Sequence, residues 1–288
     1  MSDPDLEVFF DRATNTVTAL IADPQSGAAA VIDPVLDFDA RTGRVTTASL
    51  EAVLEAARSR GWRIERVLET HAHADHLSGA DEIRRRTGAR VGVGVRITEV
   101  QTTFAPLFGM DGFKGDGAQF DDLFEDKAHF RLGELDIEVL HTPGHTPACV
   151  TYRIGAIAFV GDTLFMQDFG TARCDFPGGD ASTLFRSIQR ILSLPSQTRL
   201  ITGHDYPGAC GRTAPEWESS VAQQKQSNRH VGGQVDEGSF VEMRRSRDAG
   251  LEPPALLWPA LQVNIRAGAL PDPDERGRRF LRLPLKLP

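Results

Sequence analysis

Four side chains that can bind a metal ion stand within six residues of one another. The segment from residue 70 to residue 80 reads THAHADHLSGA, and it holds His71, His73, Asp75 and His76. Neutral imidazole and carboxylate groups are good ligands for zinc, iron and manganese. A regular helix or strand presents only some of these positions on one face, whereas a loop can direct all four towards one point. The cluster alone would also fit a metal-binding patch at the protein surface.

Three further candidate ligands follow at wide intervals, each in a short polar motif. His145 lies in HTPGHT, Asp162 in FVGDTLF and His204 in LITGHDY. Each motif follows an apolar run that predicts a strand, and loops at the ends of strands are where functional residues are commonly held. Seven potential ligands at strand ends favour a metal centre over a chance surface cluster.

The runs between these motifs predict strands and helices that alternate along the chain. Apolar runs separated by turn residues predict three strands within residues 7–35, and later ones in IERVLET, ARVGVG, HFRLGELDIEVLH, CVTYRIG, AIAFVGDTLF and TRLITGHDY. Helical spacing of apolar residues predicts helices over residues 49–58, in GADEIRRRTG and in STLFRSIQRILSL, the last with Asp180 as its N-cap. Residues 101–130 show little periodicity and are expected to form a long loop or insertion. Residues 211–250 are polar and partly helical, and a proline-rich tail follows.

The bulk composition restricts the class of protein. A chain of 288 residues with 40% hydrophobic and 25% charged residues suits one large domain or two small ones with a substantial core. The formal net charge of −8 provides no global basic field for nucleic acid, and it disfavours a role at a membrane surface. The first ten residues, MSDPDLEVFF, indicate neither a signal peptide nor a membrane span, so a cytoplasmic location is expected.

The cysteines and the two remaining candidate histidines receive structural interpretations. Cys149, Cys174 and Cys210 are far apart and form no Cys-x-x-Cys pair, which disfavours a disulfide scaffold or a structural zinc site. Cys174 follows an arginine and could be a reactive thiol or a sulfur relay, but a packed small apolar residue is the favoured interpretation. His129 and His230 stand in polar surroundings and are interpreted as solvated.

The motifs THAHADH, HTPGHT, GDT and GHD resemble those of the metallo-β-lactamase superfamily, and the resemblance extends along most of the chain. It implies an α/β fold, the αββα sandwich of two similar halves, with metal at one edge between the sheets. A single domain is expected over residues 1–288, with a C-terminal segment of about residues 211–288 closing over the site. Because family members can hold two metals, the resemblance allows a first metal on His71, His73 and His145, a second on Asp75, His76 and His204, and a bridging Asp162.

Three other segments resemble one branch of the superfamily, the persulfide dioxygenases, and especially its bacterial members once named β-lactamase-like hydrolases. These segments are TARCDFPGGDASTLFRSI, the Asp205-Tyr206 pair and PALQVNIRAG. The resemblance implies one Fe(II) per chain held by His71, His145 and Asp162, and oxidation of glutathione persulfide, or a related small persulfide, by O2 to sulfite and thiol. Two histidines and one carboxylate leave coordination positions open for the substrate and O2. The resemblance then leaves hydrogen-bonding roles around the ligands for His73, Asp75, His76 and His204.

The two carboxylates of glutathione need cationic partners. Arg173 in TARCDF and Arg266 in NIRAG are the candidate anchors, and Tyr206 is a candidate hydrogen-bonding residue. For each arginine a structural ion pair is an equally good interpretation, and for Tyr206 a structural hydrogen bond. The branch usually has Gly-Arg-Thr-Asp-Phe where this chain has Ala-Arg-Cys-Asp-Phe, so Cys174 replaces a threonine and the thiol carrier stays open.

The same ligand positions also fit functions other than that of a dioxygenase. A dinuclear zinc thiolester hydrolase like glyoxalase II would use all seven ligand positions, so these positions do not separate the two enzymes. The Asp205-Tyr206 pair, TARCDF and NIRAG favour the dioxygenase, and the metal content would decide between them. A non-catalytic sensor or scaffold is disfavoured because the ligand set is complete, and a nucleic-acid-processing enzyme is disfavoured by the acidic charge. The expected partners are a small-molecule persulfide and O2, and a homodimer is compatible with the sequence.

Overall fold

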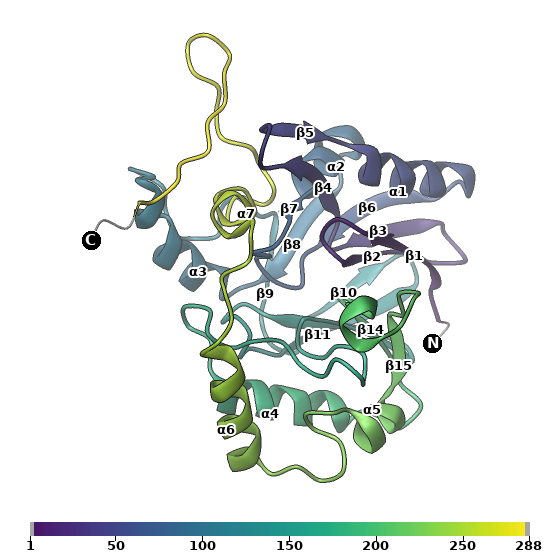
Figure 1. Ribbon diagram of the computed structural model, residues 1–288. Coiled ribbons are helices and arrows are strands. Elements are labelled where there is room, and N and C mark those ends of the chain that lie inside the picture. Colours follow the sequence, from purple (N-terminus) through teal and green to yellow (C-terminus); the bar gives the residue numbers. More distant parts are fainter. Residues whose placement is uncertain (1–2, 286–288) are drawn as a thin grey trace.

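Two six-stranded β-sheets lie face to face at the centre of the molecule, and helices cover the outer face of each sheet (Figure 1). The computed structural model describes residues 3–285. The order of helix layer, sheet, sheet and helix layer confirms the αββα sandwich that the sequence predicted.

The first sheet combines an antiparallel meander with a parallel half. Its strands, in spatial order, are β1 (Asp5–Asp11), β2 (Thr16–Ala22), β3 (Ala28–Ile32), β6 (Arg63–Leu68), β8 (Arg90–Gly94) and β9 (Asp122–Phe124). From β3 to β9 neighbouring strands run parallel. A small sheet of β5 (Arg44–Thr46), β4 (Val35–Asp39) and β7 (Leu77–Ser78) lies beside it.

The second sheet is antiparallel except for one central pair. Its strands, in spatial order, are β10 (His129–Leu132), β11 (Leu135–His141), β12 (Val150–Ile154), β13 (Ile157–Gly161), β14 (Arg199–Thr202) and β15 (Glu218–Ser220). The parallel pair is β13 and β14. Because their carboxyl ends lie at one edge, the residues after each strand come close together.

Both faces of the sheets are covered, which explains the nearly continuous apolar strands. In β2, Val17 and Ile21 face the core between the sheets, whereas Leu20 faces the core beneath the first helix layer. The helices of that layer are α1 (Ala48–Ser59), α2 (Ala80–Thr87), α3 (Ile97–Phe104) and α7 (Leu257–Asn264). Those of the second layer are α4 (Ala181–Leu192), α5 (Val221–Ser227) and α6 (Glu237–Asp248).

Helix α4 forms as its sequence predicts. The side chain of Asp180 accepts a hydrogen bond from the backbone N–H of Thr183 at 2.7 Å, which confirms it as the N-cap. Leu184, Ile188 and Ile191 recur at helical spacing and are buried against the second sheet.

The expectation of a long loop over residues 101–130 holds for residues 109–121 and is wrong for the two ends of this segment. Helix α3 continues to Phe104, a 3₁₀ turn spans Pro106–Phe108, and β9 pairs with the edge of β8. These elements are too short to give a clear periodicity, and β9 is specified by pairing with a distant strand. None of the helices within residues 3–285 is long and apolar enough to cross a membrane.

Candidate metal centre

Each metal-binding motif begins within four residues of the end of a strand. His71 follows β6 of the first sheet, while His145, Asp162 and His204 follow β11, β13 and β14 of the second. The seven predicted ligands therefore come from both sheets, and their side chains meet in two neighbouring groups.

The first group consists of His71, His145 and Asp162. Oδ2 of Asp162 lies 3.9 Å from Nε2 of His71 and 3.9 Å from Nε2 of His145. These separations are too long for hydrogen bonds. They are within the span that two metal–ligand bonds of about 2.0–2.2 Å can bridge. The three side chains therefore fit a bound metal ion.

Hydrogen bonds at Nδ1 leave Nε2 of both histidines free to bind a metal. His145 donates from Nδ1 to the backbone carbonyl of Arg173 at 2.8 Å. The hydroxyl of Thr70 donates to Asp33 at 2.8 Å, so its oxygen accepts from Nδ1 of His71 at 3.0 Å. Burial, reinforced by the neighbouring histidines, lowers the pKa of His71 well below its usual value, which keeps the ring neutral. Such orienting bonds are typical of metal-binding histidines.

A glycine allows the two halves of the centre to approach each other. Gly161, directly before Asp162, has φ +50°, and a Cβ there would lie 2.6 Å from Oγ1 of Thr70. Any larger residue would push away the hydroxyl that orients His71.

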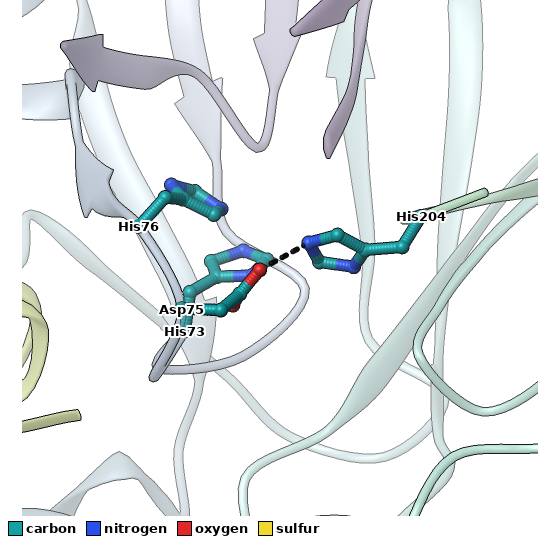
Figure 2. A group of neighbouring side chains, drawn as sticks. All are labelled: His73, Asp75, His76 and His204. Atoms are coloured by element: carbon teal, nitrogen blue, oxygen red, sulfur yellow. Dashed lines mark ion pairs between the residues drawn. The ribbon is translucent and has the colours of Figure 1, made fainter. Parts of the chain in front are cut away.

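His204 lies between two carboxylates. Its Nδ1 is 2.7 Å from Oδ1 of Asp162, and its Nε2 is 2.6 Å from Oδ2 of Asp75, the ion pair drawn in Figure 2. Burial opposes the charged ring, but Asp162 and Asp75 raise the pKa of His204 well above its usual value. Both ring nitrogens face carboxylate oxygens at hydrogen-bond distance, so a metal at His204 would have to displace one of these contacts.

His73 is turned towards two acidic residues that sequence reasoning missed. Its Nε2 lies 3.0 Å from Oδ1 of Asp33 and 3.5 Å from Oε2 of Glu69. Burial opposes the charge on His73, but these carboxylates raise its pKa to about 10. Burial raises the pKa of Glu69, so Asp33 is the carboxylate that neutralises His73. Each acid directly follows a strand, Asp33 after β3 and Glu69 after β6, which was the available sequence signal.

The second group consists of His73, Asp75, His76 and His204, whose side chains face one another in Figure 2. By its donor atoms His73 groups with these residues, although the centroid of its ring also lies 4.1 Å from that of His71. Within the described residues, Nε2 of the buried His76 has no hydrogen-bond partner. The donor set could hold a second metal only after His204 lost a proton.

The tail segment reaches the site through Asn264 and not through Arg266. Asn264 donates from its amide to the carbonyls of His73 and His76, each at 2.8 Å, and accepts from the N–H of Ser78 at 2.8 Å. Arg266 instead lies 3.6 Å from Asp272 and lines two cavities away from the metal ligands. The expectation that Arg266 anchors substrate is corrected accordingly. It lies two residues beyond Asn264, past the end of α7, and its side chain is directed away from the metal ligands.

A cavity of about 210 Å³ opens on the first group. Asp75, His145 and Asp162 line it together with Tyr206 and Arg173. Burial raises the pKa of Tyr206 to about 12, so its neutral hydroxyl can donate a hydrogen bond. Tyr206 and Arg173 therefore lie where a substrate would bind.

The guanidinium of Arg173 is already engaged, although it borders the cavity. Nε and Nη2 lie 2.5 Å from the two oxygens of Asp175, and Nη1 donates to the carbonyl of Glu252 at 2.7 Å. The neighbouring Cys174 is buried, and burial raises the pKa of its thiol to about 12. A reactive thiolate at this position is therefore disfavoured, in line with the packed interpretation.

Sequence reasoning also placed one histidine wrongly. His230, interpreted as solvated, is 6% exposed and lines the same cavity. The neighbours of His230 in the sequence are polar and therefore suggested exposure. Its burial arises instead from contacts with Gly170 and Thr171, which are distant in the sequence.

Comparisons with known proteins agree with this fold. A beta-lactamase hydrolase-like protein of Agrobacterium fabrum is 48% identical over 283 residues, which are 98% of this chain and 65% of that protein. The chain thus spans slightly less than two thirds of that relative. The human mitochondrial persulfide dioxygenase ETHE1 is 32% identical over 214 residues, 73% of this chain and 72% of that protein. A hydroxyacylglutathione hydrolase of a Methylobacterium species is 34% identical over 209 residues, 70% and 67% of the two chains.

The fold has a counterpart among solved structures. The crystal structure of ETHE1 from Myxococcus xanthus superposes with a TM-score of 0.74 and 28% identity, covering 92% of this chain and all of that one. The sequence model of the metallo-beta-lactamase superfamily matches residues 12–204, which include all seven predicted ligands. The chain belongs to the metallo-β-lactamase superfamily.

Proposed function

We propose that this protein is an iron-dependent persulfide dioxygenase that oxidises glutathione persulfide, or a related small persulfide, with O2 to sulfite and thiol. The observation that carries the proposal is the separate group of His71, His145 and Asp162. Two histidines and one carboxylate with open positions are the ligand set typical of non-haem Fe(II) oxygenases.

The partners of the remaining histidines support a single metal. Both nitrogens of His204 lie within 2.7 Å of the carboxylates of Asp162 and Asp75, and Nε2 of His73 lies 3.0 Å from Asp33, so a second metal would have to displace these contacts. The similarity to the human persulfide dioxygenase adds support from an independent direction.

The protein side chains supply position and shape. When bound, Fe(II) supplies the redox chemistry between sulfur and O2, which Zn²⁺ with its filled d shell does not. Asp162, fixed by His204, provides the negative charge of the ligand set. Phe165, Phe169 and Tyr206 form an aromatic wall of the cavity, with Phe169 and Tyr206 stacked at 4.5 Å between ring centroids. This wall suits the apolar sulfur chain and limits the access of water.

The proposed reaction balances with one added water. A persulfide RSSH, one O2 and one water give the thiol RSH, sulfite and two protons, so the sulfur–sulfur bond breaks and the terminal sulfur is oxidised. The phenol of Tyr206 lines the cavity as a neutral donor that can orient an anionic sulfur group.

A dinuclear zinc thiolester hydrolase like glyoxalase II is the second candidate. The observation that favours it is a second group of possible metal ligands. The donor atoms of this group all lie within 4.8 Å of one another and belong to His73, Asp75, His76 and His204. The hydroxyacylglutathione hydrolase relative points in the same direction. This reading requires His204 to lose a proton and leave its ion pair with Asp75.

Metal analysis combined with activity separates the two enzymes. Protein purified anaerobically from iron-replete cells is expected to hold about one iron per chain. Addition of glutathione persulfide should consume O2 and release sulfite in equal amounts. Two tightly bound zinc ions, full thiolester hydrolysis and no uptake of O2 would contradict the proposal.

A further inference from the structure

The cavity beside the metal ligands has a part that the proposed chemistry does not use. Thr171, His230, Arg244 and Arg247 line it together with the metal ligands. The two arginines come from α6 of the C-terminal segment, which packs against α4 (Figure 1). In a chain with a formal net charge of −8, this concentration of guanidinium groups beside a catalytic cavity needs an explanation.

Arg244 has a structural role. It is 3% exposed and forms an ion pair with Asp248, with Nη2 2.7 Å from Oδ1. Its Nη1 donates to the carbonyl of Thr171 at 3.1 Å, and Asp248 accepts the backbone N–H of Cys174 at 2.8 Å. Its charge is therefore neutralised within the fold, and its donors hold α6 against the cavity wall.

Arg247 differs from Arg244 and Arg173 because it lacks a counter-ion. It is exposed, lines the cavity, and has no carboxylate within ion-pair distance among residues 3–285. Partial burial, with Arg244 and Arg229 nearby, lowers the pKa of Arg247, whereas Asp175 raises that of Arg173. Asp248 is the carboxylate near Arg247, but it is paired with Arg244, so Arg247 and Arg229 leave a net positive charge here that favours an anion from outside.

His230 adds a hydrogen-bond donor without a partner. Its Nδ1 accepts the backbone N–H of Thr171 at 3.0 Å, so Nε2 carries the ring proton. Nε2 is buried and has no hydrogen-bond partner within the described residues. A buried donor that stays unpaired costs free energy, and a bound group that accepts its proton removes this cost.

We propose that Arg247 and His230 form an anion subsite of the catalytic cavity, and that this subsite binds a carboxylate of the substrate's thiol carrier. The identity of the carrier rests on the proposed function, whereas the preference for a carboxylate rests on the charge and donors at this place. The guanidinium of Arg247 has free donors for a carboxylate, whereas that of Arg173 is occupied by Asp175.

The test measures binding of S-methylglutathione, a dicarboxylate without a persulfide or thiolester, to the iron-loaded protein by calorimetry. Arg247→Gln should raise the Kd about ten- to a hundred-fold, the range for a lost charge-assisted contact. Arg245→Gln removes the same charge from an exposed position of α6 that does not line the cavity, and it should bind like the wild type. His230→Asn, which keeps an acceptor for Thr171 but loses the Nε2 donor, should also bind more weakly.

Two further readouts make the result specific. The dimethyl ester of S-methylglutathione lacks both carboxylates, so wild type and Arg247→Gln should bind it equally. Iron content and melting temperature of Arg247→Gln should match those of Arg245→Gln, because Arg247 is exposed and unpaired within residues 3–285. In assays of O2 uptake the loss should appear mainly in KM.

Equal affinity of Arg247→Gln and Arg245→Gln for S-methylglutathione, or absence of binding to the wild type, would overturn the subsite. Because the ligand does not react, this outcome is independent of the dioxygenase assay. Charge-selective binding without O2 uptake by the wild type would support the subsite and contradict the proposed function.

Discussion

Nδ1 of His204 lies 2.7 Å from Oδ1 of Asp162, and this contact determines which oxygen of Asp162 faces the other two ligands. The free oxygen, Oδ2, is the atom that lies 3.9 Å from both His71 and His145. Because Asp75 engages the opposite nitrogen, we expect His204 to orient Asp162 rather than to bind the metal itself.

The first prediction concerns this orienting role. His204→Gln should still bind about one iron per chain when iron is saturating, because the three ligands remain. Its affinity for iron should fall about ten- to a hundred-fold, the usual cost of losing a residue that orients a ligand. Titration against a competing chelator measures this change. A fall from two metals per chain to one would show instead that His204 is itself a ligand.

The second prediction concerns the ligand charge. Asp162→Asn keeps the shape of the side chain but removes the negative charge, so iron affinity should fall by at least about ten- to a hundred-fold. His129→Ala is the control, because His129 lies on β10 with about half of its side chain exposed, paired with Asp136. Equal losses of iron in both variants would contradict the ligand assignment.

The residues of the candidate site could be predicted from the sequence because each stands in a short motif after an apolar run. The strand positions were predicted from apolar runs, such as the one in Thr16–Ala22, where the structure shows every residue to be buried. The N-cap at Asp180 depended only on neighbouring residues. Structural features that depend on fewer than about ten consecutive residues could thus be predicted, because local periodicity and capping specify them.

The features that sequence reasoning missed depend on contacts between distant segments. Asn264 binds the histidine loop across 188 residues to His76, and His230 is buried by Thr171, 59 residues earlier. The orientation of His73 depends on Asp33, which is contributed by the end of β3. No local pattern records such contacts, because each joins segments that only the folded chain brings together.

The third prediction concerns Arg173, whose guanidinium joins Asp175 to the carbonyls of Leu251 and Glu252. Arg173→Ala should lower the melting temperature by about 2–4 °C, as expected for roughly 1 kcal/mol in a chain of this size. It should weaken binding of S-methylglutathione and of its dimethyl ester to a similar extent, because the cavity wall loosens.

Two companion variants test that reading of Arg173. Asp175→Asn removes the same ion pair and should reproduce both effects, while Arg173→Lys should restore only part of the stability. If Arg173→Ala instead loses affinity only for the carboxylate ligand and keeps its melting temperature, Arg173 is a substrate anchor.

The fourth prediction concerns Asn264. Asn264→Ala leaves two buried carbonyls, of His73 and His76, and one buried N–H, of Ser78, without partners. Each unpaired group costs about 1–3 kcal/mol, so the free energy of unfolding should fall by at least about 2 kcal/mol in urea titrations. Iron affinity should fall as well, since the histidine loop loses its support. Gln226→Ala, at an exposed position of α5, is the control.

The fifth prediction concerns the pH dependence of stability through His230. Burial, with Arg244, Arg247 and Arg229 nearby, lowers the pKa of His230 from 6.5 to about 3 in the folded protein. Between pH 7 and pH 5 the unfolded chain takes up a proton at this residue while the folded protein does not. Because the unfolded state then binds more protons, His230 makes stability fall as the pH falls through 6.5.

His230→Asn removes this contribution, so its melting temperature should fall less than that of the wild type between pH 7 and pH 5. Other titrating groups are common to both proteins and cancel in the comparison. His129→Ala, a histidine variant on the exposed side of β10, should follow the wild type. If His230→Asn loses as much stability as the wild type over this range, then His230 is protonated in the folded protein. Its Nδ1 could then not accept the N–H of Thr171, which contradicts the hydrogen bond on which the donor role of Nε2 depends.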